Sequence, residues 1–92
     1  MLVRISRVSS KGQIVIPQVI RAKLKIKEGD LFLFIPLSHD LILLKRISFD
    51  TEDYKKFTEE LVEELKKLRV QIKKEIIDKA LKNLIKKYQE NE

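Results

Sequence analysis

Basic side chains dominate the start of this 92-residue sequence. The first 27 residues contain seven Lys or Arg residues and no Asp or Glu. Guanidinium and ammonium groups at this density bind phosphates, because they displace the counterions condensed on a polyanion. The chemistry predicted for this segment is therefore binding to a polyanion such as nucleic acid. The alternative is a basic surface that only keeps the protein in solution.

The charge is divided unevenly along the chain. The net charge of the whole sequence is +6 at pH 7. Residues 1–48 contain nine basic and three acidic residues, whereas residues 49–92 contain eleven of each sign. All of the excess positive charge therefore belongs to the first half, as expected when one small unit contacts a polyanion.

Enzymatic chemistry has no support in the sequence. The chain has no cysteine and one histidine, which excludes disulfides, thiolate metal sites and histidine clusters, so neither a metal nor a cofactor is expected. Ser38, His39 and Asp40 are the residue types of a catalytic triad, but three adjacent residues cannot align as nucleophile, base and orienting acid. They predict a polar turn.

The location expected for this protein is the cytoplasm. The longest nearly uncharged apolar stretch, 31–44, is shorter than the roughly 20 residues needed to span a bilayer. The first residues are not followed by the apolar segment of a signal peptide. We therefore expect a soluble protein with no membrane partner.

The N-terminal half is rich in turns, since every Gly and Pro of the chain lies within its first 36 residues. Alternating residues at 3–8 and the β-branched run at 13–16 predict two strands around a turn at 9–12. Pro17 is typical of the first turn of a helix, predicted over 17–24. Hydrophobic runs at 31–37 and 41–47 predict a hairpin with a connection of three residues, 38–40, or slightly more.

Residues 49–92 are predicted to be helical. Asp50 is the expected N-cap, with Phe49 and Tyr54 as a hydrophobic staple. Apolar residues at a mean spacing of about 3.6 form one helical stripe, namely Tyr54, Phe57, Leu61, Leu65, Leu68 and Ile72. A second stripe begins five residues later, which rotates it by about 140°, and comprises Ile77, Leu81, Leu84 and Tyr88. The helix either breaks near 73–75 or continues and presents different faces.

The first half should not fold alone. About 48 residues without disulfides or metal bury little core, yet the runs at 31–35 and 41–44 are continuously apolar. Strands that are apolar on both faces need cover on both sides. We expect a homodimer or a higher homo-oligomer, in which the helical region contributes Leu61, Leu65, Leu68 and Ile72 as oligomerisation residues. Packing of the helix onto the sheet of the same chain is the alternative.

Residues 8–30, VSSKGQIVIPQVIRAKLKIKEGD, contain several linked motifs. These are an S-x-K-G-Q turn, an apolar-x-apolar-Pro segment, an Arg four residues after the Pro, and Gly-Asp before a hydrophobic strand. Together they resemble the AbrB/SpoVT/MazE family of swapped-hairpin DNA-binding domains, over about residues 3–47. The resemblance implies an α+β fold in which two chains interleave hairpins of residues 1–48 into one β-barrel, followed by a helical region at 49–92.

In this family, basic residues of the first strand, the turn and the short helix face DNA. By resemblance, the DNA-binding residues here are Arg4, Arg7, Ser10, Lys11, Arg21, Lys23 and Lys25. Well-known members have an Arg in place of Ser6 and a basic residue in place of Gln13, and some have a second Arg in place of Ala22. Base preference therefore does not carry over.

Two functions follow from the resemblance. The first is a dimeric transcriptional regulator of the AbrB type, nucleoid-associated and bound to double-stranded DNA through its basic face. The alternative is the antitoxin of a toxin–antitoxin pair, whose C-terminal region neutralises a nuclease toxin. Such antitoxin tails are usually acidic and poorly ordered alone, whereas residues 49–92 are neutral and strongly patterned, which favours the regulator.

Overall fold

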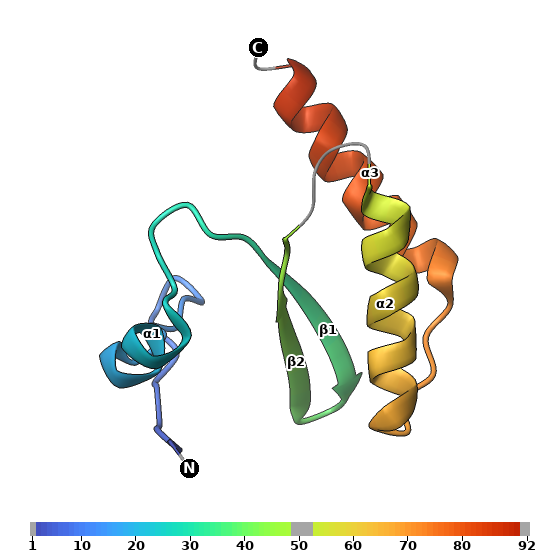
Figure 1. Ribbon diagram of the computed structural model, residues 1–92. Helices are drawn as coiled ribbons and strands as arrows, with labels where there is room; N and C mark the ends of the chain where they lie inside the picture. The colour runs from blue at the N-terminus through green and yellow to red at the C-terminus, as the bar shows by residue number, and fades with distance from the viewer. Residues whose placement is uncertain (1, 49–52, 91–92) are drawn as a thin grey trace. The chain divides into compact units, whose positions relative to one another are not determined.

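A computed structural model describes residues 2–48 and 53–90 of the chain (Figure 1). Within these residues the element order is α1–β1–β2–α2–α3, which confirms the α+β class. Packing divides the chain into two compact units, residues 1–32 and 33–92. The predicted domains, a swapped-hairpin DNA-binding domain at 1–48 and a helical region at 49–92, stay a prediction.

The N-terminal unit begins with a loop. Residues 3–8 and 13–16 form no strand, so the two strands predicted there are wrong for the single chain. Their physical requirement is missing, since strand backbone must be paired along a ladder. One backbone hydrogen bond, from Ser9 N–H to the Gln13 carbonyl (2.8 Å), joins the two arms of the loop.

Helix α1 spans Gln18–Leu24, with Pro17 at the N-cap instead of in the first turn as predicted. The Pro17 carbonyl accepts hydrogen bonds from the backbone N–H groups of Ile20 and Arg21, both at 3.0 Å. The helix ends at Lys25, which has a left-handed backbone (φ 55°). Ile26 N–H then donates to the Arg21 carbonyl (2.9 Å), as in a Schellman motif. No residue of α1 is buried.

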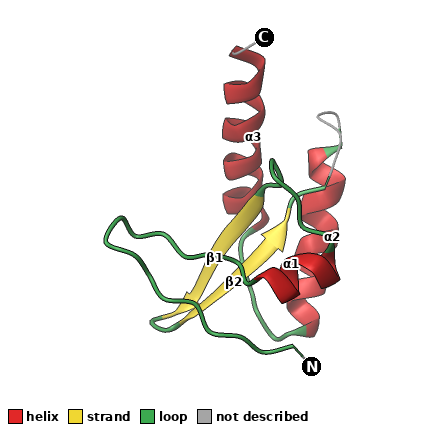
Figure 2. Ribbon diagram, turned by 90° about the vertical axis from the view of Figure 1, so that its left-hand side faces the viewer, coloured by secondary structure: helices red, strands yellow, loops and turns green. Residues whose placement is uncertain are grey.

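The second unit contains a β-hairpin made of β1 (Phe32–Ser38) and β2 (Leu41–Arg46). Its connection is two residues, His39 and Asp40, so the predicted three-residue loop is one residue too long because Ser38 belongs to the strand. Successive residues of a strand face opposite sides of the sheet, so alternate residues share a side. The side that carries Leu33, Ile35, Leu37 and Leu43 packs on the core, and both helices of this unit lie beside the hairpin (Figure 2).

Helix α2 spans Tyr54–Lys67, and Asp53 occupies its N-cap without a side-chain hydrogen bond. The predicted cap Asp50 and staple residue Phe49 lie outside the described residues. After α2 the chain turns at Arg69, whose φ is 61°. Arg69 N–H donates to the Lys66 carbonyl and Val70 N–H to the Leu65 carbonyl, both at 2.9 Å, which forms a second Schellman motif.

Helix α3 spans Lys74–Glu90. Two helices therefore occur, and the helical region breaks at 68–73, with α3 beginning within the predicted break at 73–75. The break comes where a left-handed residue ends α2, which the apolar spacing does not reveal.

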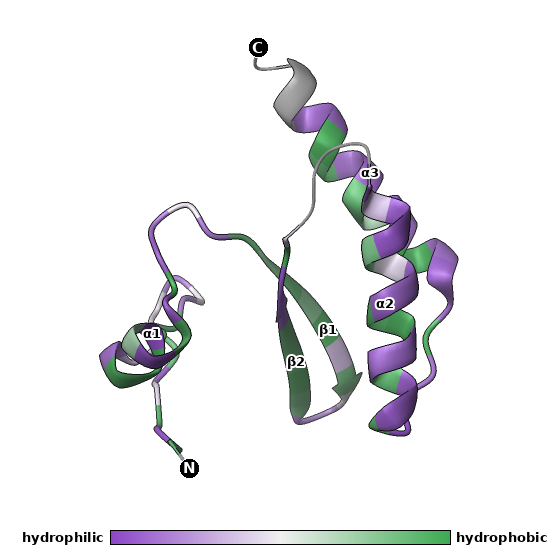
Figure 3. Ribbon diagram, viewed as in Figure 1, coloured by the Kyte–Doolittle hydropathy of each residue, from purple (hydrophilic) through white to green (hydrophobic). Residues whose placement is uncertain are grey.

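The core of the second unit is shared by the hairpin and both helices. Its buried residues are Ile35, Phe57, Leu61, Leu65, Ile77 and Leu81. Hydrophobic and hydrophilic residues alternate along α2, as the colours of Figure 3 show, and the buried residues of this helix are Phe57, Thr58, Leu61 and Leu65. Leu61 and Leu65 are each 1% exposed within their own chain, so the intrachain packing named as the alternative accounts for their burial. Leu68 differs, being 60% exposed.

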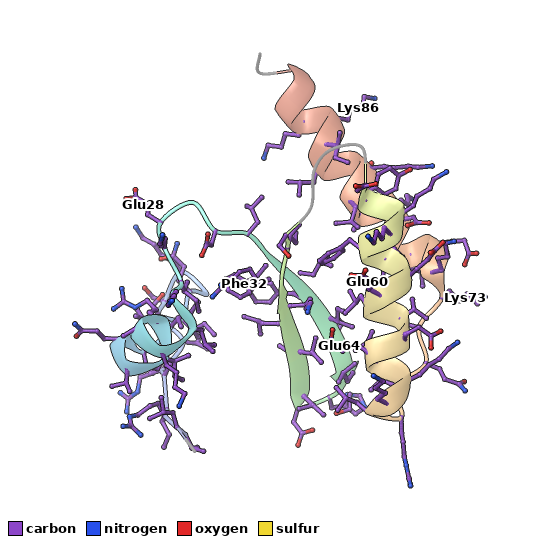
Figure 4. The ribbon with its side chains drawn as sticks, viewed as in Figure 1. Glu28, Phe32, Glu60, Glu64, Lys73 and Lys86 are labelled. Carbon is purple, nitrogen blue, oxygen red and sulfur yellow. The ribbon has the colours of Figure 1, made fainter. Side chains whose placement is uncertain are left out.

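Ion pairs bridge the rim of this core. Lys45 Nζ lies 3.2 Å from a Glu64 carboxylate oxygen, which ties β2 to α2, and Figure 4 shows Glu64 on the side of α2 that faces the hairpin. Lys74 Nζ lies 3.4 Å from Glu59 and ties the start of α3 to α2. All four side chains are partly exposed, so each pair contributes at most about 1 kcal/mol to stability.

No helix in the described part of the chain is long and apolar enough to cross a membrane.

Candidate nucleic-acid interface

All predicted DNA-contact residues lie in the N-terminal unit and are exposed. The unit has seven basic and two acidic residues, a net charge of +5. No residue among 2–32 is buried, and none of the basic side chains of residues 2–27 is in an ion pair with a described residue. The positive charge of this unit is therefore available to an external anion.

The turn at 9–12 presents Ser10 and Lys11 at its tip. Gly12 N–H donates to the Ser9 carbonyl at 3.0 Å, and Gly12 takes a left-handed backbone (φ 75°) that allows the chain to return. A Cβ atom at Gly12 would meet no atom within 4 Å. Gly12 is therefore required by backbone conformation, and the two central residues of the turn point their side chains into solvent.

Helix α1 spreads its basic residues over more than one face. Arg21 and Lys23 are two positions apart, about 200° around the helix axis. One flat row of phosphates cannot meet both at once, so Arg21 and Lys23 would contact different parts of a polyanion. Lys25 follows in the left-handed cap position, which costs about 1–2 kcal/mol for a residue with a side chain.

Arg4 begins the basic segment. Its guanidinium donates to the neighbouring Val3 carbonyl at 2.9 Å. This bond uses one of five guanidinium N–H donors, so the rest of the group stays available to an anion.

The Ser38-His39-Asp40 segment forms a polar turn. The Ser38 hydroxyl donates to the Asp40 carboxylate at 3.2 Å, and all three residues are exposed. Since the serine proton is directed to the carboxylate and not to the imidazole, this arrangement is not that of an activated nucleophile. Within the described residues no group of three or more His, Cys, Asp or Glu could hold a metal ion.

Each unit also carries an apolar surface without cover. In the N-terminal unit Ile5 is 96% exposed, and Val3, Val8, Ile14 and Val15 are exposed as well. In the second unit the hairpin face away from the core exposes other large side chains, namely Phe34, Ile42 and Leu44. Large apolar side chains gathered on an exposed surface are typical of sites of association.

Sequence reasoning missed the hydrogen-bonding serines of this unit. The Ser6 hydroxyl contacts the backbone of Val15, and the Ser9 hydroxyl contacts the backbone of Lys11 and Gln13. A turn serine such as Ser9 could have been expected to bond locally. Nothing in residue type or spacing indicates the contact between Ser6 and Val15, nine positions apart.

One protein family matches this half of the chain. Residues 5–48 match the model of the family described as "Antidote-toxin recognition MazE, bacterial antitoxin". The matched segment, just under half of the chain, contains every predicted DNA-contact residue except Arg4. The resemblance predicted from residues 8–30 is thereby confirmed. No curated protein and no solved structure matches the chain.

Proposed function

We propose that this protein, whose residues 5–48 form a domain of the MazE antitoxin family, is a dimeric transcriptional regulator that binds duplex DNA through its basic N-terminal unit. The observation that carries the proposal is a unit of net charge +5 whose basic side chains are all exposed. The proposed contact residues are Arg4, Arg7, Ser10, Lys11, Arg21, Lys23 and Lys25. Such a regulator acts in the cytoplasm, associated with the nucleoid.

The chemistry of these side chains suits a duplex. Lys and Arg neutralise phosphates and release counterions, which supplies affinity without sequence preference. Arg can also donate two hydrogen bonds to one guanine in the major groove, whereas Lys acts as a point charge. Arg7 and Arg21 are the candidates for base contacts, while Lys11 at the turn tip and Ser10 beside it suit phosphate oxygens.

The backbone of Lys25 adds support. A glycine would occupy its left-handed position with less strain, so the chain accepts a cost of about 1–2 kcal/mol to hold a cation there. Strained residues are concentrated at functional sites. The left-handed conformation itself closes the Schellman motif that ends α1, and a charge contact to DNA would account for the choice of lysine over glycine there.

We propose that two copies interleave their hairpins into one barrel. A unit with no buried residue among 2–32 cannot offset the conformational entropy lost on folding. The uncovered face of the hairpin, with Phe34 at 60% exposure, also lacks a partner in the single chain. Closing the strands of two chains into one barrel would cover both surfaces and remove the free sheet edges. The two-fold axis of such a dimer favours a pseudo-palindromic DNA site.

Fluorescence anisotropy of a labelled duplex, titrated at several NaCl concentrations, tests the DNA contact. If the dimer neutralises about six phosphates, log K should fall against log[salt] with a slope near −5. Lys11→Gln and Arg21→Gln should each reduce the slope by about 2, because two copies lose one contact each. Lys82→Gln removes the same charge from an exposed position of α3 and is the matched control. An affinity that does not change with salt refutes the proposal.

A reduced salt slope indicates a lost phosphate contact only if the variant keeps the fold of the parent protein. Far-UV circular dichroism of Lys11→Gln and Arg21→Gln should equal that of the parent protein. Loss of helix in either variant would assign that residue a structural role. Light scattering after size exclusion measures the dimer directly, and a monomer would contradict the interleaved barrel.

The second candidate function is the antitoxin of a toxin–antitoxin pair. The description of the matched family favours it, and residues 49–92 would then engage the toxin. Against it, α2 and α3 pack on the hairpin of their own chain instead of forming an acidic, extended tail. A small nuclease encoded beside this protein, inhibited by the purified chain in a cleavage assay, would favour the antitoxin. Inhibition that fails at excess protein would favour the regulator.

A further inference from the structure

We propose that Ser6 and Ser9 are positioning residues of the DNA-binding surface, which hold the loop 6–15 in the conformation that presents Arg7 and Lys11. We call these two hydroxyls and their backbone partners the serine clasp. The inference rests on the proposed DNA binding, and goes beyond it by assigning a role to two residues that are not themselves required to touch DNA.

Ser6 closes the open end of the loop. Its hydroxyl donates to the Val15 carbonyl at 2.8 Å and accepts from the Val15 N–H at 3.2 Å. One side chain thus satisfies both backbone groups of a residue nine positions away. This is the pairing that a neighbouring strand would supply in a ladder, and no strand is present here.

Ser9 closes the turn end of the loop. Its hydroxyl oxygen accepts from the backbone N–H groups of Lys11 (3.3 Å) and Gln13 (3.2 Å). The Ser9 backbone also pairs with Gln13 and Gly12. Ser9 therefore fixes the path of the chain on both sides of Lys11.

The clasp sets where the cations point. Arg7 directly follows Ser6, is exposed, and takes part in none of the hydrogen bonds of the clasp. Lys11 lies at the tip of the turn that Ser9 holds. The two cations thus belong to a loop closed at both ends.

Within one chain, burial does not order this loop. None of residues 5–15 is buried, and four of the six hydrogen bonds that hold it use a serine hydroxyl. A loop ordered mainly by side-chain hydrogen bonds loses its geometry when the hydroxyls are removed. The cost then appears when DNA binds, because the loop must be ordered at that moment.

The experiment measures DNA affinity and salt slope for Ser6→Ala and Ser9→Ala in the full chain. Two hydrogen bonds at an exposed site correspond to about a 2- to 5-fold loss for each copy, hence about 4- to 25-fold for a dimer. The slope against log[salt] should stay that of the parent protein, since no phosphate contact is removed. Ser6→Thr retains a hydroxyl and should restore affinity. Ser38→Ala breaks a serine hydrogen bond outside the loop and is the control, with no change expected.

Amide hydrogen exchange distinguishes this inference from the proposed function. Ser6→Ala should accelerate exchange at Val15, and Ser9→Ala at Lys11 and Gln13. If the parent protein binds DNA and both alanine variants bind within twofold of it, the positioning role is overturned. A reduced salt slope in either variant also overturns it, because the serine would then lie in a phosphate contact. A parent protein that binds no DNA refutes the proposed function, while unchanged exchange at Val15 refutes the clasp itself.

Discussion

Replacement of Arg69 tests the account of how α2 ends. Arg69 holds a left-handed backbone (φ 61°) in a Schellman motif closed by two hydrogen bonds of 2.9 Å. Such a conformation costs an L-residue about 1–2 kcal/mol and costs glycine almost nothing. Glycine loses about 0.5–1 kcal/mol more than alanine in backbone entropy on folding. Arg69→Gly should therefore be about 1 kcal/mol more stable than Arg69→Ala.

The comparison with Arg69→Ala is chosen because both variants lose the same charge. The guanidinium lies near the C-terminus of α2, where a cation contributes about 0.3–1 kcal/mol. Comparing Gly with Ala removes this contribution and leaves the backbone alone. The side chain of Arg69 is exposed, so neither change opens a cavity.

Urea unfolding followed by circular dichroism measures the difference, at equal protein concentration because association stabilises the folded state. In a thermal scan 1 kcal/mol corresponds to about 4–8 °C for a domain of this size. Should Arg69→Gly be equal to or less stable than Arg69→Ala, the left-handed residue would not be strained and the reason given for the break between α2 and α3 would be wrong.

Two further substitutions test the core of the second unit and the turn at Gly29 in the N-terminal unit. Leu81→Ala removes most of a side chain that is 0% exposed and leaves a cavity in the core. It should lower the free energy of unfolding, measured by urea unfolding, by about 2–5 kcal/mol. Leu68→Ala, at 60% exposure, is its control; a loss above about 1 kcal/mol there would mean that a partner buries Leu68, as its predicted oligomerisation role requires. Gly29→Ala should destabilise the turn by about 1–2 kcal/mol, because Gly29 has a φ of 94° that disfavours a residue with a side chain. The added Cβ would meet no atom within 4 Å, so the whole cost comes from the backbone conformation. Similar midpoints for Gly29→Ala and the parent protein would contradict this.

The helical half of the fold was predictable because its signal is local. The spacing of Phe57, Leu61 and Leu65 already places them on one face, and that face is the one buried. The end of α2 was not predictable from the same pattern. Its left-handed residue is an arginine and not the glycine that usually marks a helix end.

The strands predicted at 3–8 and 13–16 do not form in the single chain. The alternation of Val3 and Ile5 indicates which side chains would share a face of a strand. It does not indicate whether a neighbouring strand is present to pair with the backbone. The basic residues of the candidate site could be proposed from the sequence, because the charge of each side chain follows from its residue type. The contact of Ser6 with Val15 was not, because a hydroxyl can bond many backbone groups and only the path of the chain decides which.

Charge and apolar surface oppose each other within the N-terminal unit. In the proposed dimer, two bodies of net charge +5 would come together, and this repulsion would oppose the burial of Val3, Ile5 and Val8, which are exposed in the single chain. Salt screens the repulsion, so it should strengthen the dimer, while the same salt weakens DNA binding through counterion release. Phosphates placed against the basic residues relieve the repulsion as well, so DNA should favour the dimer. The two steps of the proposed mechanism therefore respond to salt with opposite signs, and a dimer that dissociates as salt rises would show that ion pairs and not apolar contacts hold it together.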